Sequence, residues 1–147
     1  MTLQYADTSA IARAYLPDEP EHHELRRALL RADGPVVTSE VARIEVASAI
    51  MSASRSGRAT GWQSVLATVE KDMGPDGPIT LISLRRAVIL ATAYRLVLEH
   101  RLRTLDAIHL AVAIEECPGL AAGEEVAFVT RGRDQAAAAG ALGLTVR

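Results

Sequence analysis

Short apolar runs that alternate with longer helical patterns are the feature of this sequence that most limits its fold. The expected strands cover residues 3–6, 35–38, 79–82, 126–130 and 144–146. Stretches with apolar residues at helical spacing separate them, at residues 9–15, 21–32, 40–55, 61–73, 84–99, 104–116 and 134–141. Strands that alternate with helices predict a parallel sheet covered on both faces. We therefore expect an α/β fold of three layers, with a four- to five-stranded parallel sheet between helices.

Length and composition are typical of one domain with a single sheet. The chain has 147 residues, of which 49% are hydrophobic and 23% charged, so we expect a single domain over residues 1–147. No apolar run approaches the roughly 20 residues that span a bilayer, and the start, MTLQYADTSA, does not resemble a signal peptide. Cys117 is the only cysteine, so no internal disulfide can form. These features favour a reducing, cytoplasmic location without membrane association.

Charge and residue usage exclude several kinds of function. The formal net charge is −2, so any contact with nucleic acid needs local basic patches. Lys71 is the only lysine, which excludes nucleases that use a catalytic lysine. A phosphoacceptor receiver domain needs an acidic pair after the first strand and a lysine after the last, and this chain has neither. A haloacid-dehalogenase-type phosphatase does not fit, because Ser9 stands where its second aspartate belongs.

Acidic residues recur near the expected carboxyl ends of the strands, where ligand sites lie in open parallel sheets. Asp7 directly follows the first strand, and Glu45 lies early in the helix after the second. Asp106 opens a strongly apolar helix, and Asp134 follows the fourth strand. Carboxylates that gather in one place repel each other, and a divalent cation removes that conflict. Oxygen ligands suit Mg²⁺ or Mn²⁺, so the pattern predicts a metal-dependent site for phosphate-ester hydrolysis.

Asp106 is the most informative of these acids, because nearly every residue from Leu105 to Ile114 is apolar. A helix that is apolar over most of its surface is expected to be buried. A lone buried carboxylate is strongly unfavourable unless it is paired or bound to a cation. The helix dipole favours it by only about 0.3–1 kcal/mol, and Thr104 is the expected helix cap. We therefore expect Asp106 to be buried and to face a bound cation.

Each of these residues also has a simpler possible role. Asp7 and Asp134 precede helices and can cap them, and a glutamate such as Glu45 usually lies on a solvated helix surface. His109, one turn after Asp106, can carry protons or serve as a packed, hydrogen-bonded structural residue. We expect the structural role for His109.

Four segments resemble, in order and spacing, those of PIN-domain ribonucleases, and more narrowly those of the VapC toxins of bacterial toxin–antitoxin pairs. The segments are YADTSAIARAYLPDEP, SEVARIEVASAI, RLRTLDAIHLAVAI and FVTRGRDQAAAAGALGLTV. The resemblance runs nearly end to end, and RTLDAIHLA is its most specific piece. It implies a PIN-like three-layer sandwich and Mg²⁺- or Mn²⁺-dependent cleavage of structured RNA, such as tRNA or rRNA. It also implies inhibition by a cognate VapB-type antitoxin and a toxin homodimer.

The family's acidic positions carry over onto Asp7, Glu45 and Asp106, and the resemblance implies that these three hold the metal. The fourth family acid stands two residues after the threonine that ends the fourth strand, where this chain has Gly132. Asp134, two residues later, either reaches the site through a water as a fourth catalytic acid or leaves the site with three acids. Two interpretations follow: an active ribonuclease, or a PIN-fold protein that binds RNA or an antitoxin without cutting.

Arginine is the expected RNA contact, because its guanidinium matches phosphate oxygens. Arg101, Arg103, Arg131 and Arg133 flank the acids in sequence, with surface charge pairing as their alternative role. Aromatic residues make up only 3% of the chain, which argues against broad stacking on single-stranded bases. Specificity is therefore expected to come from the shape of the RNA.

Overall fold

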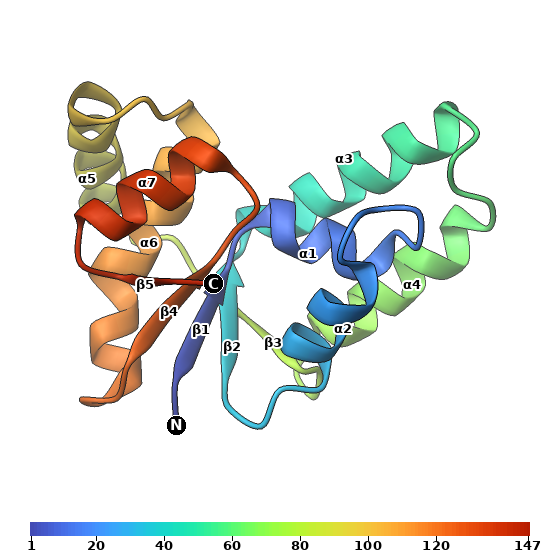
Figure 1. Ribbon diagram of the computed structural model, residues 1–147, viewed down its shortest axis with the longest axis horizontal. Coiled ribbons are helices and arrows are strands. Elements are labelled where there is room, and N and C mark those ends of the chain that lie inside the picture. The colour runs from blue at the N-terminus through green and yellow to red at the C-terminus, as the bar shows by residue number, and fades with distance from the viewer.

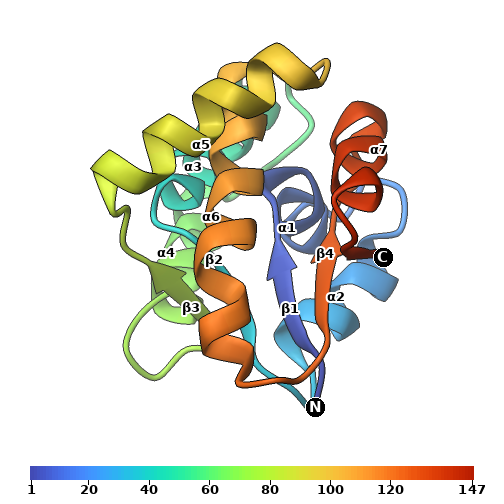
Figure 2. The same cartoon turned by 90° about the vertical axis from the view of Figure 1, so that its left-hand side faces the viewer.

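Five strands form one parallel sheet in the computed structural model, which describes all 147 residues. The strands are β1 (Leu3–Ala6), β2 (Val36–Ser39), β3 (Ile79–Ile82), β4 (Val126–Val129) and β5 (Thr145–Val146), in the order β3-β2-β1-β4-β5. Every pair of neighbours is parallel. Figure 2 shows β1 and β4 side by side and pointing the same way. The predicted parallel sheet is confirmed.

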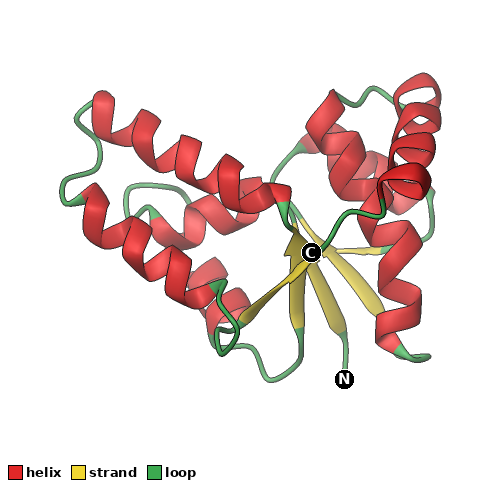
Figure 3. Ribbon diagram, turned by 180° about the vertical axis from the view of Figure 1, so that it is seen from behind, coloured by secondary structure: helices red, strands yellow, loops and turns green.

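Seven helices cover the two faces of this sheet. They are α1 (Thr8–Tyr15), α2 (His22–Leu30), α3 (Val41–Arg55), α4 (Trp62–Asp72), α5 (Arg86–Glu99), α6 (Thr104–Ala121) and α7 (Arg133–Ala141). Helices α1 to α4 lie on one face and α5 to α7 on the other (Figures 1 and 3), which is the predicted three-layer arrangement. No helix combines the length and the apolar composition that a bilayer crossing requires.

The sheet divides the core into two layers, because successive residues of a strand point to opposite faces. Tyr5, Val37 and Phe128 pack with α5 to α7, whereas Ala6 and Val129 pack with α1 to α4. Both layers consist mainly of aliphatic residues. The pleat of β1 thus sends Tyr5 into the layer that contains α6, the helix that begins with the apolar segment around Asp106.

The topology places a switch point at β1. The chain passes from β1 to β2 on one side of the sheet and later returns to β4 on the other side. In open parallel sheets, ligand sites lie beyond the carboxyl ends of the strands at such a point. Asp7 follows β1 and Thr130 follows β4, so both lie where the sequence argument expects a site.

Element ends agree with the sequence predictions to within two residues, except at α6. The predicted end precedes Pro118, but α6 continues to Ala121. Proline inside a helix costs about 3 kcal/mol or more, and burial of Cys117 and Ala121 in the core offsets this cost. The predicted cap is also wrong: Arg103 holds the cap position without a side-chain hydrogen bond, and Thr104 is the first helical residue.

Candidate active site

Asp7 is buried at the end of β1, with 3% of its surface exposed. Its Oδ1 accepts hydrogen bonds from the Ser9 hydroxyl at 2.6 Å and the Ala10 backbone N–H at 3.2 Å. Its Oδ2 accepts a hydrogen bond from the Thr130 hydroxyl at 2.5 Å. The bond from Ala10 caps α1. Capping and a place in the acidic site are therefore compatible roles for Asp7.

Glu45 opens the second turn of α3 and reaches toward α1 and α6. Its Oε1 accepts hydrogen bonds from Thr8 Oγ1 at 2.9 Å and from His109 Nε2 at 2.6 Å, and 20% of its side chain is exposed. Burial alone raises the pKa of Glu45. The hydrogen bonds from His109 and Thr8, together with the electrostatic effect of the His109 ring, outweigh burial and hold the pKa below its usual value. Glu45 is thus an ionised group held by donors from two other helices.

Tyr5 and His109 form a buried hydrogen-bonded chain behind Glu45. Tyr5 Oη lies 2.7 Å from His109 Nδ1 and accepts a hydrogen bond from the Ser39 backbone N–H at 3.1 Å. Burial raises the pKa of Tyr5 well above its usual value, so the phenol stays protonated. The Tyr5 ring stacks on Phe128 with centroids 5.4 Å apart. His109 is therefore packed and hydrogen-bonded, as the sequence analysis expects.

Asp106 lies in the first turn of α6, and the expectation that it is buried is wrong. Its side chain is 38% exposed, because this turn emerges from the core, and Leu105 beside it is exposed as well. The pKa of Asp106 lies above its usual value because the carboxylate is partly buried and because Asp7 and Glu45 repel its charge. Arg103 opposes this shift, with its Nε 3.9 Å from Oδ2.

The structure brings Asp7, Glu45 and Asp106 to one region of the molecule. Thr8, which follows Asp7 in the chain, donates to Glu45, and so does His109, which lies one turn after Asp106. A cavity of about 390 Å³ is lined by Glu45, Arg103, Thr104, Leu105 and Asp106. No three acidic, histidine or cysteine side chains are grouped closely enough to enclose a metal ion. The three carboxylates are nevertheless hard oxygen donors of the kind that Mg²⁺ and Mn²⁺ prefer.

Asp134 stands apart from these three acids. It is exposed in the first turn of α7. It lines a second cavity, of about 300 Å³, together with His100 and Arg101. The cavity that Glu45 and Asp106 share does not include it. Gly132, at the position of the fourth family acid, caps α7 without any side chain.

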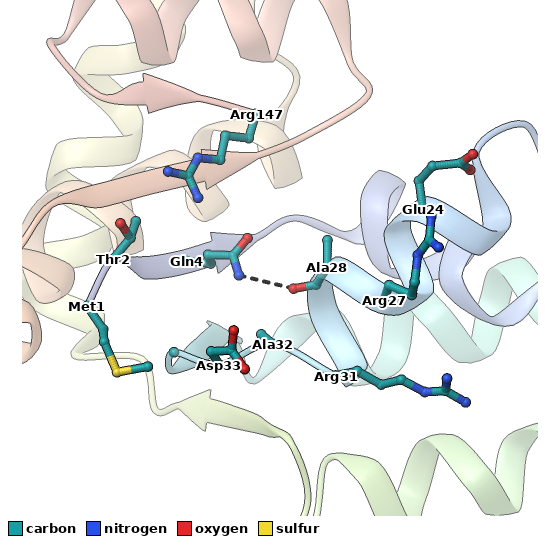
Figure 4. A pocket seen from close by; sticks show the side chains of 11 residues that line it. Met1, Thr2, Gln4, Glu24, Arg27, Ala28, Arg31, Ala32, Asp33 and Arg147 are labelled. Atoms are coloured by element: carbon teal, nitrogen blue, oxygen red, sulfur yellow. Dashed lines mark hydrogen bonds between the residues drawn. The ribbon is translucent and has the colours of Figure 1, made fainter.

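A larger cavity, of about 560 Å³, lies beside α2 and the start of β1. Figure 4 shows the Gln4 side chain in this cavity, where its Nε2 donates to the backbone oxygen of Ala28 at 3.0 Å, with Arg31 extending away from them. This cavity shares no residue with the acidic region. The charged chemistry expected at the switch point is therefore found in the smaller cavity.

Three of the four arginines that were predicted to contact RNA are available for that role. Arg103 is 94% exposed, and Arg101 and Arg133 are exposed as well. Arg131 is instead tied down by an ion pair with Glu21 at 2.8 Å and by hydrogen bonds to two backbone carbonyls. Arg131 therefore fixes the loop after β4 and has little freedom to bind a phosphate.

Sequence reasoning did not single out Tyr5 or Gln135. A phenol at an inward strand position needs a hydrogen-bond partner, which is a usable signal, but the partner His109 lies 104 residues away. Gln135 is buried in α7, and its Nε2 donates to the backbone oxygen of Asp106 at 3.0 Å. Its Oε1 is the only buried side-chain polar atom without a hydrogen-bond partner. No local pattern around Gln135 predicts this contact.

Comparisons with known proteins bear on the family and the fold of the chain. The model of the PIN domain family matches residues 5–141. The chain is 35% identical over 113 residues to Ribonuclease VapC46 of Mycobacterium tuberculosis, and the alignment covers 77% of this chain and 75% of that protein. Its fold is similar to the crystal structure of Mycobacterium tuberculosis VapC20, described as a Sarcin-Ricin loop cleaving toxin. The TM-score is 0.65 at 16% identity, with 97% of this chain and 96% of that one covered.

Proposed function

Because the chain belongs to the PIN domain family, and within it to the VapC-type ribonucleases, we propose that it is a Mg²⁺- or Mn²⁺-dependent endoribonuclease toxin of the cytoplasm. Its substrate is structured RNA, either tRNA or rRNA, and a cognate VapB-type antitoxin neutralises it. The observation that carries the proposal is the approach of three acids at the switch point. Partial burial and the charges of Asp7 and Glu45 raise the pKa of Asp106, so the site favours an added positive charge.

The side chains differ in how much of each carboxylate is free for a cation. The only ion-pair partner of Asp106 is Arg103, whose Nε lies 3.9 Å from Oδ2. Glu45 uses Oε1 for both of its hydrogen bonds, which leaves Oε2 without a protein partner. Asp106, Glu45 and Asp7 would hold the ion. When bound, Mg²⁺ or Mn²⁺ orients and polarises a phosphate and lowers the pKa of a bound water.

The substrate assignment rests on charge and on the scarcity of aromatic side chains. Arg101 and Arg103 are exposed in the loop before α6, and Arg133 is exposed at the start of α7. Their guanidinium groups suit phosphate oxygens. No exposed aromatic side chain lines the acidic cavity, so recognition depends on RNA shape rather than on base stacking. The description of VapC20 as a Sarcin-Ricin loop cleaving toxin supports rRNA as one of the two substrate classes.

Cleavage of tRNA and rRNA fragments by the purified chain tests this proposal. We expect cleavage with Mg²⁺ or Mn²⁺ and none in excess chelator. Asp106→Asn should fold and lose activity. Asp33→Asn is the matched control, because Asp33 is an exposed aspartate that lines the separate cavity beside α2, and it should cleave normally. Cleavage that continues in chelator, or in the Asp106→Asn protein, would refute the proposed site.

A second candidate function is binding of RNA or antitoxin without cutting, and Gly132 is the observation that favours it. Gly132 places no carboxylate where the family has its fourth acid, and Asp134 lines a different cavity. RNA that binds the chain in filter or gel-shift assays but stays intact with either metal would support this second function over the first.

The antitoxin is expected to cover the acidic cavity. Ile44, beside Glu45 on α3, is an exposed large apolar residue, and an amphipathic helix could place an apolar side chain on it. Addition of the antitoxin should stop RNA cleavage, and Ile44→Glu should weaken this inhibition while RNA cleavage continues. Equal inhibition of Ile44→Glu and the wild type would place the antitoxin elsewhere.

The proposed homodimer has a candidate surface on α5. Leu90, Tyr94, Val97 and Leu98 are exposed along one side of this helix, and contiguous exposed apolar residues mark association sites. Light scattering after gel filtration should give a dimer for the wild type and a monomer for Tyr94→Glu. A wild-type monomer at high concentration would contradict the homodimer.

A further inference from the structure

A continuous hydrogen-bonded chain leads from β2 through the core to Glu45. The Ser39 N–H donates to Tyr5 Oη at 3.1 Å, Tyr5 Oη lies 2.7 Å from His109 Nδ1, and His109 Nε2 lies 2.6 Å from Glu45 Oε1. Tyr5 and His109 are almost fully buried. The chain therefore connects a carboxylate at the cavity wall to groups that no solvent molecule reaches.

The partners fix the direction of the hydrogen bond between His109 and Glu45. Glu45 is ionised and can only accept, so His109 Nε2 carries a hydrogen and donates it. Tyr5 Oη accepts a hydrogen bond from the Ser39 N–H and is hydrogen-bonded to His109 Nδ1 on its other side. Tyr5 Oη and both ring nitrogens of His109 are thus hydrogen-bonded, as is expected of buried polar groups.

This network acts on one oxygen of Glu45 and leaves the other free. Both the Thr8 hydroxyl and His109 Nε2 donate to Oε1. The His109 ring is in turn held by Tyr5, whose own ring stacks on Phe128 at an interplanar angle of 6°. A glutamate on a helix surface otherwise samples many rotamers. Anchoring Oε1 fixes a side chain that lines the cavity with Asp106, and no hydrogen bond to the protein occupies Oε2.

We propose that His109 and Tyr5 are positioning residues that hold Glu45 in the conformation needed to bind the divalent cation. This inference rests on the proposed function of the site. Neither Tyr5 nor His109 lines the cavity that Glu45 and Asp106 share, so the pair acts on that cavity only through Glu45. Groups that orient a metal ligand typically change metal affinity or activity by about 10–100-fold when they are removed.

Mn²⁺ titration by calorimetry, without RNA, measures this effect directly. His109→Leu removes the donor to Glu45 and should weaken Mn²⁺ binding by about 10–100-fold. His109→Gln can again place an amide N–H near Glu45, so it should recover part of the affinity. Tyr5→Phe leaves His109 in place but frees its ring, so its loss should be smaller than that of His109→Leu. RNA cleavage should lose kcat in the same order, with little change in KM.

Tyr15→Phe is the matched control for general destabilisation. Tyr15 is also a buried tyrosine, and its hydroxyl donates to Asp72 at 2.8 Å on the other face of the sheet. This variant should bind Mn²⁺ as tightly as the wild type even where it melts earlier. Circular dichroism and thermal melts identify variants that do not fold. If His109→Leu does not fold, the Mn²⁺ affinity of Tyr5→Phe compared with that of Tyr15→Phe tests the positioning role.

The outcomes separate this inference from the proposed function. A wild type that cleaves RNA in a metal-dependent way, with unchanged Mn²⁺ affinity and kcat in folded His109→Leu and Tyr5→Phe, overturns only the positioning role. A wild type that neither binds Mn²⁺ nor cleaves RNA overturns the proposed function, and the inference with it. Graded loss across the three variants, absent in Tyr15→Phe, supports the inference.

Discussion

Replacement of Thr130 by valine tests how strongly the fold depends on holding Asp7. Thr130 Oγ1 donates to Asp7 Oδ2 at 2.5 Å and accepts a hydrogen bond from the Gly132 N–H at 3.1 Å. Valine keeps the shape of threonine, so the change removes the hydroxyl without opening a cavity. Loss of a hydrogen bond to a charged group costs about 1.5–3 kcal/mol, and the unpaired N–H of Gly132, which is only partly buried, adds roughly 0.5–1 kcal/mol. We expect the free energy of unfolding to fall by about 2–4 kcal/mol.

Urea unfolding at neutral pH measures this loss, and an unchanged m-value would show that the folded state is otherwise the same. In a thermal melt the loss corresponds to about 4–16 °C. Thr38→Val is the matched control: Thr38 is fully buried, and its hydroxyl donates to the neutral Ala6 carbonyl at 2.7 Å. This control should lose only about 1 kcal/mol. If Thr130→Val is no more destabilising than Thr38→Val, the hydrogen bond to Asp7 is no stronger than one to a neutral carbonyl.

Three further changes test the charges around the site. Because the pKa of Asp106 is raised in the folded protein, the contribution of this group to stability is fully present below its ordinary pKa and is lost as the pH rises through the raised value. Asp106→Asn should therefore melt at a higher temperature than the wild type at pH 7 in chelator, but not at pH 3. Equal melting temperatures at pH 7 would contradict this prediction. Gly132→Asp places a carboxylate at the position of the fourth family acid; its Cβ meets Gln135 Cβ at 3.3 Å, so Gln135 must shift by a few tenths of an ångström, and Thr130 Oγ1 at 3.6 Å. This variant should raise kcat for RNA, and unchanged kcat would show that three acids suffice. Arg103→Ala should make the plot of the logarithm of the RNA-binding constant against the logarithm of salt concentration less steep by about 1. An unchanged slope in filter binding would show that Arg103 does not contact the RNA.

Most of the fold follows from local patterns, because the strands and helices differ so clearly in length and apolar spacing. The strand over 79–82 and the helix that ends at Tyr15 lie where the pattern predicts them. The end of α6 does not, because a local rule about Pro118 competes with tertiary burial of Cys117 and Ala121. The packing of the whole chain decides between the two effects, and a local sequence pattern holds no information about that packing.

The approach of the acids could be predicted, but their individual environments could not. The rule that strand ends meet at one edge selects Asp7 and also the elements that carry Glu45 and Asp106. The same reasoning placed Asp106 inside the core, since the apolar stretch after it is continuous. The first turn of α6 nevertheless lies outside the core, with Leu105 exposed. Tyr5 could not be assigned a partner from sequence, because His109 meets it only through the tertiary fold.

The three acids are held to different degrees, and this gradient explains why Asp106 tolerates its position. Asp7 accepts hydrogen bonds from three donors, and Glu45 accepts two. The Asp106 carboxylate accepts no hydrogen bond from the protein, and its one ion-pair partner, Arg103, lies 3.9 Å away. Hydrogen bonds therefore do not offset the electrostatic repulsion at Asp106, and partial burial together with its acidic neighbours raises its pKa. Because the Asp106 side chain is partly exposed, water can solvate its negative charge without a partner from the protein. The same exposure leaves this carboxylate accessible to a cation. Asp7 and Glu45, in contrast, are held in place by hydrogen bonds from the protein itself.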